Sequence, residues 1–532
     1  MTPHYDYDYL IVGSGFGGSV SALRLAQKGY KVAVLEAGKR WAPGDFPASN
    51  WKVWRWLWAP GLKLHGIMQM TFYRRITVLS GAGVGGGSLV YANTLLVPPQ
   101  EVFDAPDWGQ GRAKGEWFQR MQPFYAQAKQ MLGVTPTPRA FKGDQLLQEY
   151  AREIGREDHF HLTTVGVYFG EPGKTVPDPF FGGEGPERTG CNFCGGCMTG
   201  CQFGSKNTLD RNYLYLAEKL GVQVVPETKV ERFEPIAGPG PVGSHGYTVH
   251  TRRSTSWFSP QRRTLRARHL VLSAGVLGTL PLLMRAKEAG LPLSDALGKV
   301  VRTNSEAVVG VTGSDAHDHQ SAGVAIASGL YVNDNTHIEI VRYRKEANAV
   351  SLMTTLLTDG GGSVPRFVRF LGTILRHPIA FVRSMIKVNW ADRSVILLVM
   401  QTLDNSVRME MQRWFGIGPK RLVPVAAPGD IPTYIPEGHE AARWFARRMD
   451  GVAMSSVAEV IADAPTTAHI LGGARIGSDP ATSVVGTDNR VHGVANLYVI
   501  DGSMIPVNLG VNPSLTITAL AEHAMSLIPP KA

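Results

Sequence analysis

The first 36 residues carry a regular succession of strand-like and helix-like hydrophobic patterns. Residues 9–12 form a short apolar run of the kind found in strands buried on both faces. Apolar residues then recur at helical spacing from Val20 to Ala26, and Gly29 stands where a helix usually ends. A second apolar run covers residues 31–35. The pattern predicts a strand, a crossover helix and a second, parallel strand.

Glycines fill the turn between the first strand and the helix. Gly13, Gly15 and Gly18 satisfy the pattern G-x-G-x-x-G, Gly17 lies among them, and Glu36 follows the second strand. Such a turn lets the backbone approach a pyrophosphate, and the helix N-terminus offers free N–H groups to the phosphates. The carboxylate is placed to bind an adenosine ribose. These features indicate dinucleotide binding, and the alternative is a plain βαβ crossover with a glycine-rich turn.

A second glycine-rich segment lies at residues 80–93. It contains Gly85, Gly86, Gly87 and Ser88, continues to Asn93, and lies between the apolar stretches 76–79 and 89–92. Dense glycine between strands favours ordered backbone pressed against a flat ligand. A flexible linker, the alternative, is typically richer in serine and is not flanked by strands.

On these loops, the chain resembles the flavoproteins of the glucose–methanol–choline (GMC) family, and within it the cholesterol oxidase branch. The resemblance implies that FAD, rather than NAD, binds the two glycine loops and Glu36. It implies further cofactor contacts at positions later in the chain: Val230, Ala274, Gly275, Asp501, Gly502 and Asn512.

The fold class that we expect is α/β: a Rossmann-type FAD-binding domain of discontinuous segments, with a second α+β substrate domain built on an antiparallel sheet. The FAD-binding domain takes residues 1–44, 205–305 and 466–532. The substrate-binding domain takes residues 45–204 and 306–465, including loops that form a lid or face a membrane. Residues 300–465 favour this division because they lack the βαβ rhythm and contain strand patterns such as 337–343.

The last 70 residues hold the candidate reaction chemistry. Oxidising an alcohol with a flavin needs a hydride transfer and an acceptor for the hydroxyl proton, and histidine has a suitable ordinary pKa of ~6.5. A neighbouring amide fixes the orientation of the hydroxyl. His469 and Asn512 match the histidine and asparagine of the cholesterol oxidase motifs, although Ile470 stands where the family more often has proline. The alternative is that His469 only holds the turn at 472–473.

Cholesterol oxidases also use a glutamate to move a double bond after the oxidation, and Glu339 is the best counterpart here. Its alternative is a solvent-facing strand carboxylate. The resemblance therefore implies FAD-dependent oxidation of a lipophilic alcohol, above all a 3-hydroxysteroid, to the ketone, with or without isomerisation. His469 receives the proton, and the electron acceptor is oxygen or an electron-transfer partner.

Length and charge add two constraints. At 532 residues the chain is too long for a single core, so we expect two or more domains. The net charge of +10 raises nucleic acid and anionic membranes as partners. Six arginines flank a predicted hairpin at residues 246–268: Arg252, Arg253, Arg262, Arg263, Arg266 and Arg268. We interpret them as the solvated face of a β-meander, so no nucleic-acid partner is expected.

The N-terminal residues carry no basic region, and the first strand begins almost at once, which disfavours a signal peptide. No apolar run approaches the ~18 residues that a bilayer span requires. We therefore expect a cytoplasmic protein without a transmembrane helix, either soluble or peripheral on a membrane.

One stretch favours contact with a membrane surface. There is no acidic residue between Asp359 and Asp392. Cations at helical spacing stand opposite an apolar set: Arg366, Arg369, Arg376, Arg383 and Lys387 against Phe367, Phe370, Leu371, Ile374, Phe381, Met385 and Val388. This pattern is typical of an in-plane membrane helix, which Pro378 must break or kink. The alternative is an ordinary surface helix that packs on the substrate domain.

A second stretch is rich in tryptophan. Its four indoles alternate with Lys52 and Arg55: Trp51, Trp54, Trp56 and Trp58. Indoles with interleaved cations suit the headgroup region of a bilayer. Packing of the indoles in a lid or a domain contact is the alternative.

All four cysteines lie within eleven residues: Cys191, Cys194, Cys197 and Cys201. Their spacing, C-x2-C-x2-C-x3-C, is that of bacterial ferredoxins without the final proline. An iron–sulfur cluster and a zinc site are two interpretations, and structural thiols or disulfides are the third. A cluster would make the protein an FAD-dependent dehydrogenase that passes electrons to an acceptor other than oxygen. An alternative of another class is a non-catalytic, flavin-bearing membrane-binding protein.

Overall fold

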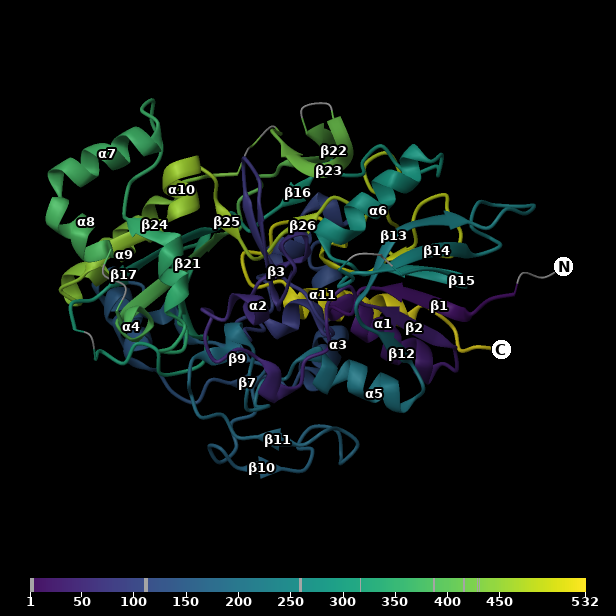
Figure 1. Cartoon of the computed structure of the whole chain (residues 1–532), viewed down its shortest axis with the longest axis horizontal. Coiled ribbons are helices and arrows are strands. Elements are labelled where there is room, and N and C mark those ends of the chain that lie inside the picture. Colours follow the sequence, from purple (N-terminus) through teal and green to yellow (C-terminus); the bar gives the residue numbers. More distant parts are fainter. Residues whose placement is uncertain are drawn as a thin grey trace.

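The computed structural model describes residues 4–109, 113–257, 261–315, 317–385, 388–414, 417–427, 429 and 431–532. At the N-terminus the predicted unit forms, with β1 (Tyr7–Val12), α1 (Phe16–Gln27) and β2 (Val32–Leu35). Strands β1 and β2 are parallel, as the pattern predicts. Figure 1 shows this unit at the end of the molecule where both termini lie.

The first large sheet collects strands from distant parts of the chain in the order β12-β2-β1-β15-β14-β13, with β27 beside β15. Its further strands are β12 (Gln223–Val225), β13 (Thr228–Pro235), β14 (Tyr247–Arg253), β15 (Arg262–Leu272) and β27 (Leu497–Val499). The pairs among β12, β2, β1, β15 and β27 are parallel. This is the Rossmann-type sheet that the sequence predicts. In the predicted hairpin β14–β15, Arg252 and Arg262 form ion pairs with Glu231 on β13.

The second large sheet is antiparallel throughout, in the order β20-β24-β17-β21-β19-β18-β8. Its strands are β8 (Phe160–Leu162), β17 (Ala307–Thr312), β18 (Ile326–Asn333), β19 (Thr336–Val341), β20 (Thr354–Leu356), β21 (Ser394–Gln401) and β24 (Val452–Ser456). Alternate residues such as Val309 and Leu397 pack on α4 (Lys142–Glu153) and α9 (Pro436–Arg448). The α/β fold class is therefore confirmed, while the domain limits at single residues stay a prediction.

The remaining elements are short or connect the two sheets. The helices are α2 (Val53–Trp56), α3 (Glu116–Met131), α5 (Tyr213–Lys219), α6 (Val276–Glu288), α10 (Val457–Ala462) and α11 (Ser514–Ser526). The strands are β3 (Trp58–Ala59), β4 (Leu64–His65), β5 (Met68–Phe72), β6 (Thr77–Gly81), β7 (Thr135–Pro136), β9 (Thr164–Val165), β10 (Thr175–Val176), β11 (Arg188–Thr189), β16 (Val301–Arg302), β22 (Arg408–Trp414), β23 (Ile417–Val425), β25 (Thr466–Thr467) and β26 (Leu471–Gly472). Helix α5 is preceded by a loop and by a 3₁₀ turn at Leu209–Arg211.

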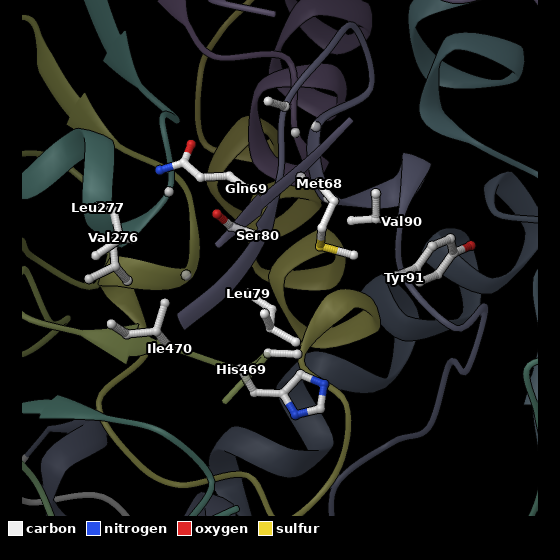
Figure 2. Close-up of a pocket in the computed structure, with 18 of the residues that line it drawn as sticks. Met68, Gln69, Leu79, Ser80, Val90, Tyr91, Val276, Leu277, His469 and Ile470 are labelled. Atoms are coloured by element: carbon white, nitrogen blue, oxygen red, sulfur yellow. The ribbon is translucent and has the colours of Figure 1, made fainter. Parts of the chain in front are cut away.

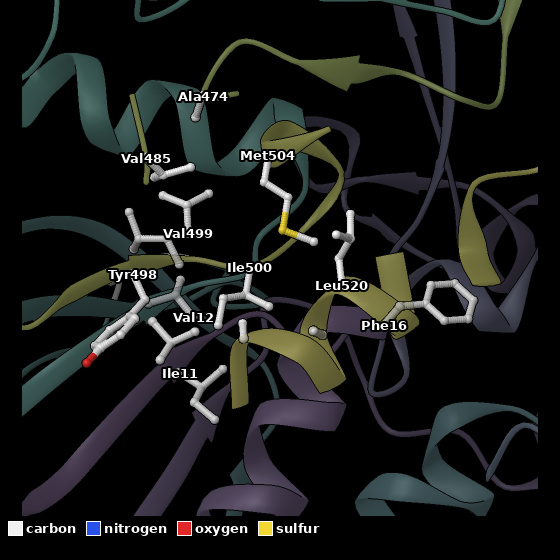
Figure 3. Close-up of a cluster of buried hydrophobic side chains, with 14 of the residues drawn as sticks. Ile11, Val12, Phe16, Ala474, Val485, Tyr498, Val499, Ile500, Met504 and Leu520 are labelled. Atoms are coloured by element: carbon white, nitrogen blue, oxygen red, sulfur yellow. The ribbon is translucent and has the colours of Figure 1, made fainter. Parts of the chain in front are cut away.

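Side chains from both ends of the chain share one core beneath the first sheet. Figure 3 shows Val12 of β1 beside Ile500 after β27, with Met504 and Leu520 of α11 next to them. Helix α11 also packs against α1 and α3. The C-terminal segment is therefore part of the nucleotide-binding fold.

Two glycines of the first turn are required by close backbone contacts. A Cβ built on Gly17 would lie 1.8 Å from the carbonyl oxygen of Ile500, and one on Gly18 would lie 2.1 Å from that of Gly13. Real side chains do not approach a backbone atom so closely. Helix α1 can therefore press against the end of β27 and against its own turn only because these positions lack a Cβ.

Residues 366–385 form two helices, α7 (Arg366–Arg376) and α8 (Pro378–Met385), and the break at Pro378 is as predicted. Figure 1 shows them at the opposite end of the molecule from the termini. The predicted cationic face is wrong at Arg366, which is buried and donates to the carbonyls of Thr358 and Thr433. Phe370 is buried too. Lys387, the fifth predicted cation, lies outside the described residues.

Four residues of the predicted apolar set are exposed, and three further apolar side chains of this helical pair also face solvent; the predicted four are Phe367, Leu371, Met385 and Val388. The exposed fraction is 82% for Leu375, 74% for Ile379 and 62% for Val382. Helical periodicity alone could not decide which face packs inward, because both faces of α7 carry large apolar groups. Within the part of the chain described, no helix is both long and apolar enough to cross a membrane.

The glycine contacts predict different effects at neighbouring positions. Gly17→Ala should lower the free energy of unfolding by about 1–3 kcal/mol or more, since its methyl group would overlap backbone. Gly15→Ala is the matched control, because a Cβ there meets nothing within 4 Å, and its stability should stay within about 1 kcal/mol of wild type. Urea unfolding of the flavin-free proteins measures both. Equal losses would contradict the assignment.

Candidate active site

A cavity of 640 Å³ runs between the two sheets. Its walls come from the first glycine turn, from β5 and β6, from the start of α6, from the second sheet and from the C-terminal segment. Figure 2 shows part of it, with Met68, Val90 and Tyr91 on one side, Val276 and Leu277 on the other, and His469 below Leu79. The cavity therefore joins the predicted dinucleotide grip to the predicted catalytic residues.

At one end of the cavity, the first turn has the features of a phosphate site. Gly15 is the N-cap of α1, and the space where its Cβ would stand is open. The N-terminus of α1 therefore directs free N–H groups into the cavity. Glu36 also lines the cavity, and its carboxylate accepts hydrogen bonds from Ser14 Oγ (2.6 Å), Ser14 N (3.1 Å) and Gly38 N (2.7 Å). Burial raises the pKa of Glu36, and these hydrogen bonds oppose that rise.

The second glycine segment rests directly on the first. A Cβ on Gly86 would lie 2.7 Å from Gly15 Cα, so the two turns touch through their backbones. Gly86 and Gly87 line the cavity. In the described structure Gly85, Ser88 and Asn93 are not among the lining residues. The Ser88 hydroxyl donates to Gly85 O (2.7 Å) and accepts from Leu209 N (3.0 Å), so it shapes the loop from behind.

The remaining predicted cofactor positions gather around the same cavity, which Val230, Ala274, Gly275, Asp501 and Gly502 all line. Asp501 joins two elements through its carboxylate. Its Oδ2 accepts from Gly275 N (2.9 Å) and Thr279 Oγ1 (2.5 Å), and its Oδ1 accepts from Ser503 N (2.8 Å). It thereby fixes the start of α6 against the end of β27.

The predicted catalytic side chains meet at the other end of the cavity. Asn512 precedes α11, and its Nδ2 lies 3.5 Å from His469 Nε2 and donates to Glu339 Oε2 at 3.2 Å. The start of α11, from Asn512 to Ser514, lines the cavity, so the positive end of this helix faces it. Within the residues described, Asn512 Oδ1 and Glu339 Oε1 are buried without a hydrogen-bond partner.

One member of the site, Glu306, escaped sequence analysis. It precedes β17, is almost fully buried, and places Oε1 2.5 Å from His469 Nδ1, while its Oε2 accepts from Ala468 N. Burial by itself would lower the pKa of His469, but the Glu306 carboxylate outweighs it and holds the pKa above its usual 6.5. An acidic residue before an apolar strand was the only signal in the sequence, and that is too common to identify a site.

Backbone geometry places Glu306. The two residues before it, Asn304 and Ser305, have φ of 59° and 50°, a left-handed conformation that non-glycine residues rarely adopt. Asn304 donates from Nδ2 to Val511 O (2.8 Å) and accepts at Oδ1 from Leu509 N (3.0 Å). The turn that carries Glu306 is thus tied to the segment that carries Asn512.

Glu339 lies on β19, fully buried behind Asn512, and in the described structure it does not line the cavity. Burial raises its pKa to about 7, against the opposing effects of the Asn512 hydrogen bond and of nearby His469. The carboxyl group therefore changes its charge near neutral pH. The alternative of a solvent-facing strand carboxylate is wrong, because the side chain has no exposed surface.

Beyond His469 the cavity continues along the second sheet. Its lining there is mainly apolar: Val308, Tyr343, Val350, Met353, Trp390, Ile396, Leu398 and Met454. An apolar chamber that ends at an imidazole and an amide suits a large lipophilic molecule with one hydroxyl group. The indoles of the tryptophan-rich segment differ in position: Trp58 lines the cavity, whereas Trp51 and Trp54 are exposed.

The four cysteines are free and line a second, small cavity with Lys206 and Arg344. Among the described residues, no group of three or more His, Cys, Asp or Glu side chains is placed to hold a metal ion. Burial, and then the neighbouring thiol of Cys197, raise the pKa of Cys194 to about 11, which favours the thiol over the metal-binding thiolate. The metal site at Cys191, Cys194, Cys197 and Cys201 therefore stays a prediction without structural support.

Lys206 connects the cysteine segment to the second glycine loop. Its ammonium group donates to Leu89 O (3.1 Å), Tyr91 O (2.8 Å) and Cys197 O (2.9 Å), although burial lowers its pKa to about 7. Three carbonyl acceptors match the three N–H bonds of the charged form. This contact holds the loop that carries Gly86 and Gly87.

The residues present fit FAD. The glycine turn leaves a cradle at Gly15 that a Cβ would fill, and the orphaned N–H groups of α1 suit its pyrophosphate. Glu36 and Val230 suit the adenosine half, and the turns at Gly86 and Gly275 continue toward His469. Bound there, FAD would supply a hydride acceptor.

The contact between Glu306 and His469 predicts a shift in pH dependence. If His469 accepts a proton during turnover, activity must rise with pH through its pKa, because only the neutral ring can accept. Glu306→Gln removes the charge that raises this pKa, so the acid limb of kcat should move to lower pH. The maximal kcat should fall by about 10²-fold, because the His469 ring becomes a weaker base.

Stopped-flow reduction of the flavin across pH measures this effect. Glu234→Gln is the matched control, since it removes an exposed carboxylate that lies 3.0 Å from His250. The acid limb of the control should coincide with that of the wild type. If the acid limb of Glu306→Gln does not move, Glu306 does not raise the pKa of the catalytic base.

Comparison with known proteins identifies a family with this architecture. Two family models described as GMC oxidoreductase match residues 186–301 and 428–521, and one described as an NAD(P)-binding Rossmann-like domain matches residues 11–44. The chain is 47% identical to a cholesterol oxidase of Acinetobacter baumannii, covering 99% of this chain and 95% of that protein. It is 46% identical to a cholesterol oxidase of Mycobacterium tuberculosis, covering 99% and 92%.

Among solved structures, pyridoxine 4-oxidase from Mesorbium loti superposes with a TM-score of 0.63 at 16% identity, over 98% of both chains, which speaks for the fold alone. Near-complete coverage at almost half identity, by contrast, is enough to show the family. The chain belongs to the GMC oxidoreductase family.

Proposed function

We propose that this protein uses FAD to oxidise the 3-hydroxyl group of cholesterol or a related sterol to the ketone. The observation that carries the proposal is the meeting of His469 and Asn512 at the end of an apolar chamber that is continuous with the dinucleotide turn. The relatives named cholesterol oxidase support the sterol as substrate.

Each polar side chain receives a role from its contacts. With the Nδ1 proton of His469 directed at Glu306, its Nε2 is the atom that can accept the hydroxyl proton. Glu306 then stabilises the imidazolium, as a buried carboxylate does beside other catalytic histidines. Asn512 sets the position of the hydroxyl from the other side. The apolar lining excludes water and orients the sterol ring system.

The electron acceptor that we propose is oxygen, since two relatives that the chain matches over almost its full length are named cholesterol oxidase. Transfer through an iron–sulfur cluster is the weaker candidate, because no group of three or more His, Cys, Asp or Glu side chains among the described residues is placed to hold a metal ion. Hydrogen peroxide formed in step with ketone supports oxygen.

The decisive experiment is anaerobic mixing of the holoenzyme with cholesterol in detergent. The flavin absorption should bleach, and it should not bleach with the same sterol lacking its hydroxyl. His469→Gln should slow bleaching by about 10²–10⁴-fold with the flavin still bound. An unbleached flavin with every sterol, but bleaching with short-chain alcohols, would replace the substrate assignment.

The same reaction tests isomerisation. We propose Glu339 as the base, which requires its side chain to turn past Asn512 toward the sterol. Glu339→Gln should then accumulate the unisomerised ketone, which lacks the ultraviolet absorption of the conjugated product. An unchanged product ratio removes Glu339 from this step.

We also propose that the helical pair α7–α8 docks on an anionic membrane surface. Its outer side combines exposed Leu375, Ile379 and Val382 with exposed Arg376 and Arg383. Aliphatic groups beside cations, without any acidic residue, complement anionic headgroups over acyl chains. Helix α8 packs on β20 and β24, whose Thr354 and Met454 line the apolar chamber. Docking here would bring a bilayer close to the sterol-binding end.

Vesicle binding tests this surface. The triple variant Leu375→Ser/Ile379→Ser/Val382→Ser should lose binding to phosphatidylserine vesicles and keep its activity on micellar cholesterol. Arg376→Ser/Arg383→Ser should weaken that binding by about 2 kcal/mol, with little change on neutral vesicles. Leu220→Ser, another exposed leucine, is the control. Wild-type binding by all variants would refute the proposal, as would self-association through this surface in sedimentation.

A further inference from the structure

A buried histidine next to the site has no role in the chemistry proposed so far. His337 lies on β19 two residues before Glu339, so both side chains project from the same face of the sheet. It is 1% exposed, and neither ring nitrogen has a hydrogen-bond partner within the described residues. Buried polar atoms without protein partners are rare, and ordered water usually satisfies them.

His337 is linked to the surface by a second histidine. The ring of His161, on the edge strand β8, lies parallel to that of His337 with centroids 5.2 Å apart and an interplanar angle of 10°. His161 is half-buried and so reaches solvent. Tyr331 stacks on His337 at 4.4 Å and on His161 at 5.9 Å, so the three rings form one cluster. Met400 of β21 is the neighbour of His337 across the sheet. The imidazole is therefore held between neighbours that leave its nitrogens unpaired.

The lack of a Cβ at Gly329 of β18 lets the two imidazoles converge. Gly329 pairs with Glu339 on one side and with His161 on the other, so all three positions form one row across the sheet. A Cβ built on Gly329 would lie 2.3 Å from His337 Nε2 and 3.0 Å from His161 Nε2. The two nitrogens are thus no more than 5.3 Å apart, a gap that one water molecule spans with two hydrogen bonds.

Glu339 at the inner end needs such a connection. Its carboxyl group is fully buried, Oε1 has no partner in the described structure, and Asn512 stands between it and the cavity. A sterol in the chamber would close that side to water. The isomerisation itself returns the proton to the sterol, but a carboxyl group with a pKa of about 7 must first lose its own proton to the solvent before it can act as the base.

We infer that His337 and His161, with a water molecule seated over Gly329, form the path by which Glu339 exchanges protons with solvent. In each transfer an imidazole accepts a proton on one ring nitrogen and releases another from its second nitrogen. One N–H or O–H bond forms for each that breaks, and no oxidant or reductant is consumed. The role of Glu339 in turnover rests on the proposed function, but the path itself does not.

Proton exchange at Glu339 is measured without turnover. Below pH 7, where a pKa of about 7 keeps the group protonated, infrared difference spectra give its C=O stretch, assigned by the loss of the band in Glu339→Gln. After transfer of the sterol-loaded anaerobic holoenzyme into D₂O, the wild-type band should shift rapidly. In His337→Phe and His161→Phe, which keep the ring stacking, the shift should be about tenfold slower or more, because exchange then requires local opening.

Gly329→Ala tests the water position separately, since its methyl group would occupy the gap, and its unfolding midpoint shows whether the sheet tolerates it. His250→Phe is the matched control, a histidine on the other sheet that should leave the exchange rate unchanged. Wild-type exchange rates in both His337→Phe and His161→Phe would overturn the inference. So would variants that slow flavin reoxidation by oxygen and leave deuteration unchanged. Failure of sterols to bleach the wild-type flavin would instead count against the proposed function.

Discussion

The whole arrangement depends on backbone contacts that only glycine permits. The first turn, the second glycine loop and the end of β27 approach one another so closely that a Cβ on Gly13, Gly17 or Gly86 would fall within 3 Å of backbone atoms. Because of these contacts, segments from residues 13, 86 and 500 form a continuous wall. The positive ends of α1 and α11 both open onto the cavity behind that wall. Cofactor grip and catalytic groups are therefore parts of one rigid frame.

Within that frame, the chemistry is governed by how buried charges are compensated. Glu306 lies 2.5 Å from His469 and raises its pKa, whereas Glu339 has only an amide hydrogen bond and its pKa rises to about 7. Two carboxyl groups within one site thus have different partners, an imidazole for Glu306 and an amide for Glu339. Asn512 stands between them, in contact with both His469 and Glu339. Its amide is uncharged, so it can lie next to both the imidazole and the carboxyl group.

Periodicity and turn chemistry predicted the elements that repeat a strong local pattern. The unit β1–α1–β2 and the break at Pro378 were both readable from the sequence. The inward position of Arg366 was not, because its burial depends on the carbonyl of Thr433 and on nearby Glu459, both distant in sequence, as well as on the carbonyl of Thr358. Glu306 was missed for the same reason, since its value to the site comes from a histidine 163 residues away. His469 and Asn512 could be identified from the sequence through a family resemblance. The contacts of Glu339 became visible only in the folded structure.

The pairing of β27 with β15 also affects how the chain folds while it is being synthesised. On the ribosome, β1, β2 and β15 emerge well before residues 497–499, and α11 comes later still. Until then the parallel edge of β15 has no partner on that side, and α1 lacks one of the helices that cover it. A nascent chain must therefore carry an open sheet edge until β27 has been synthesised. The wall around the cavity is complete only once β27 and α11 have joined it.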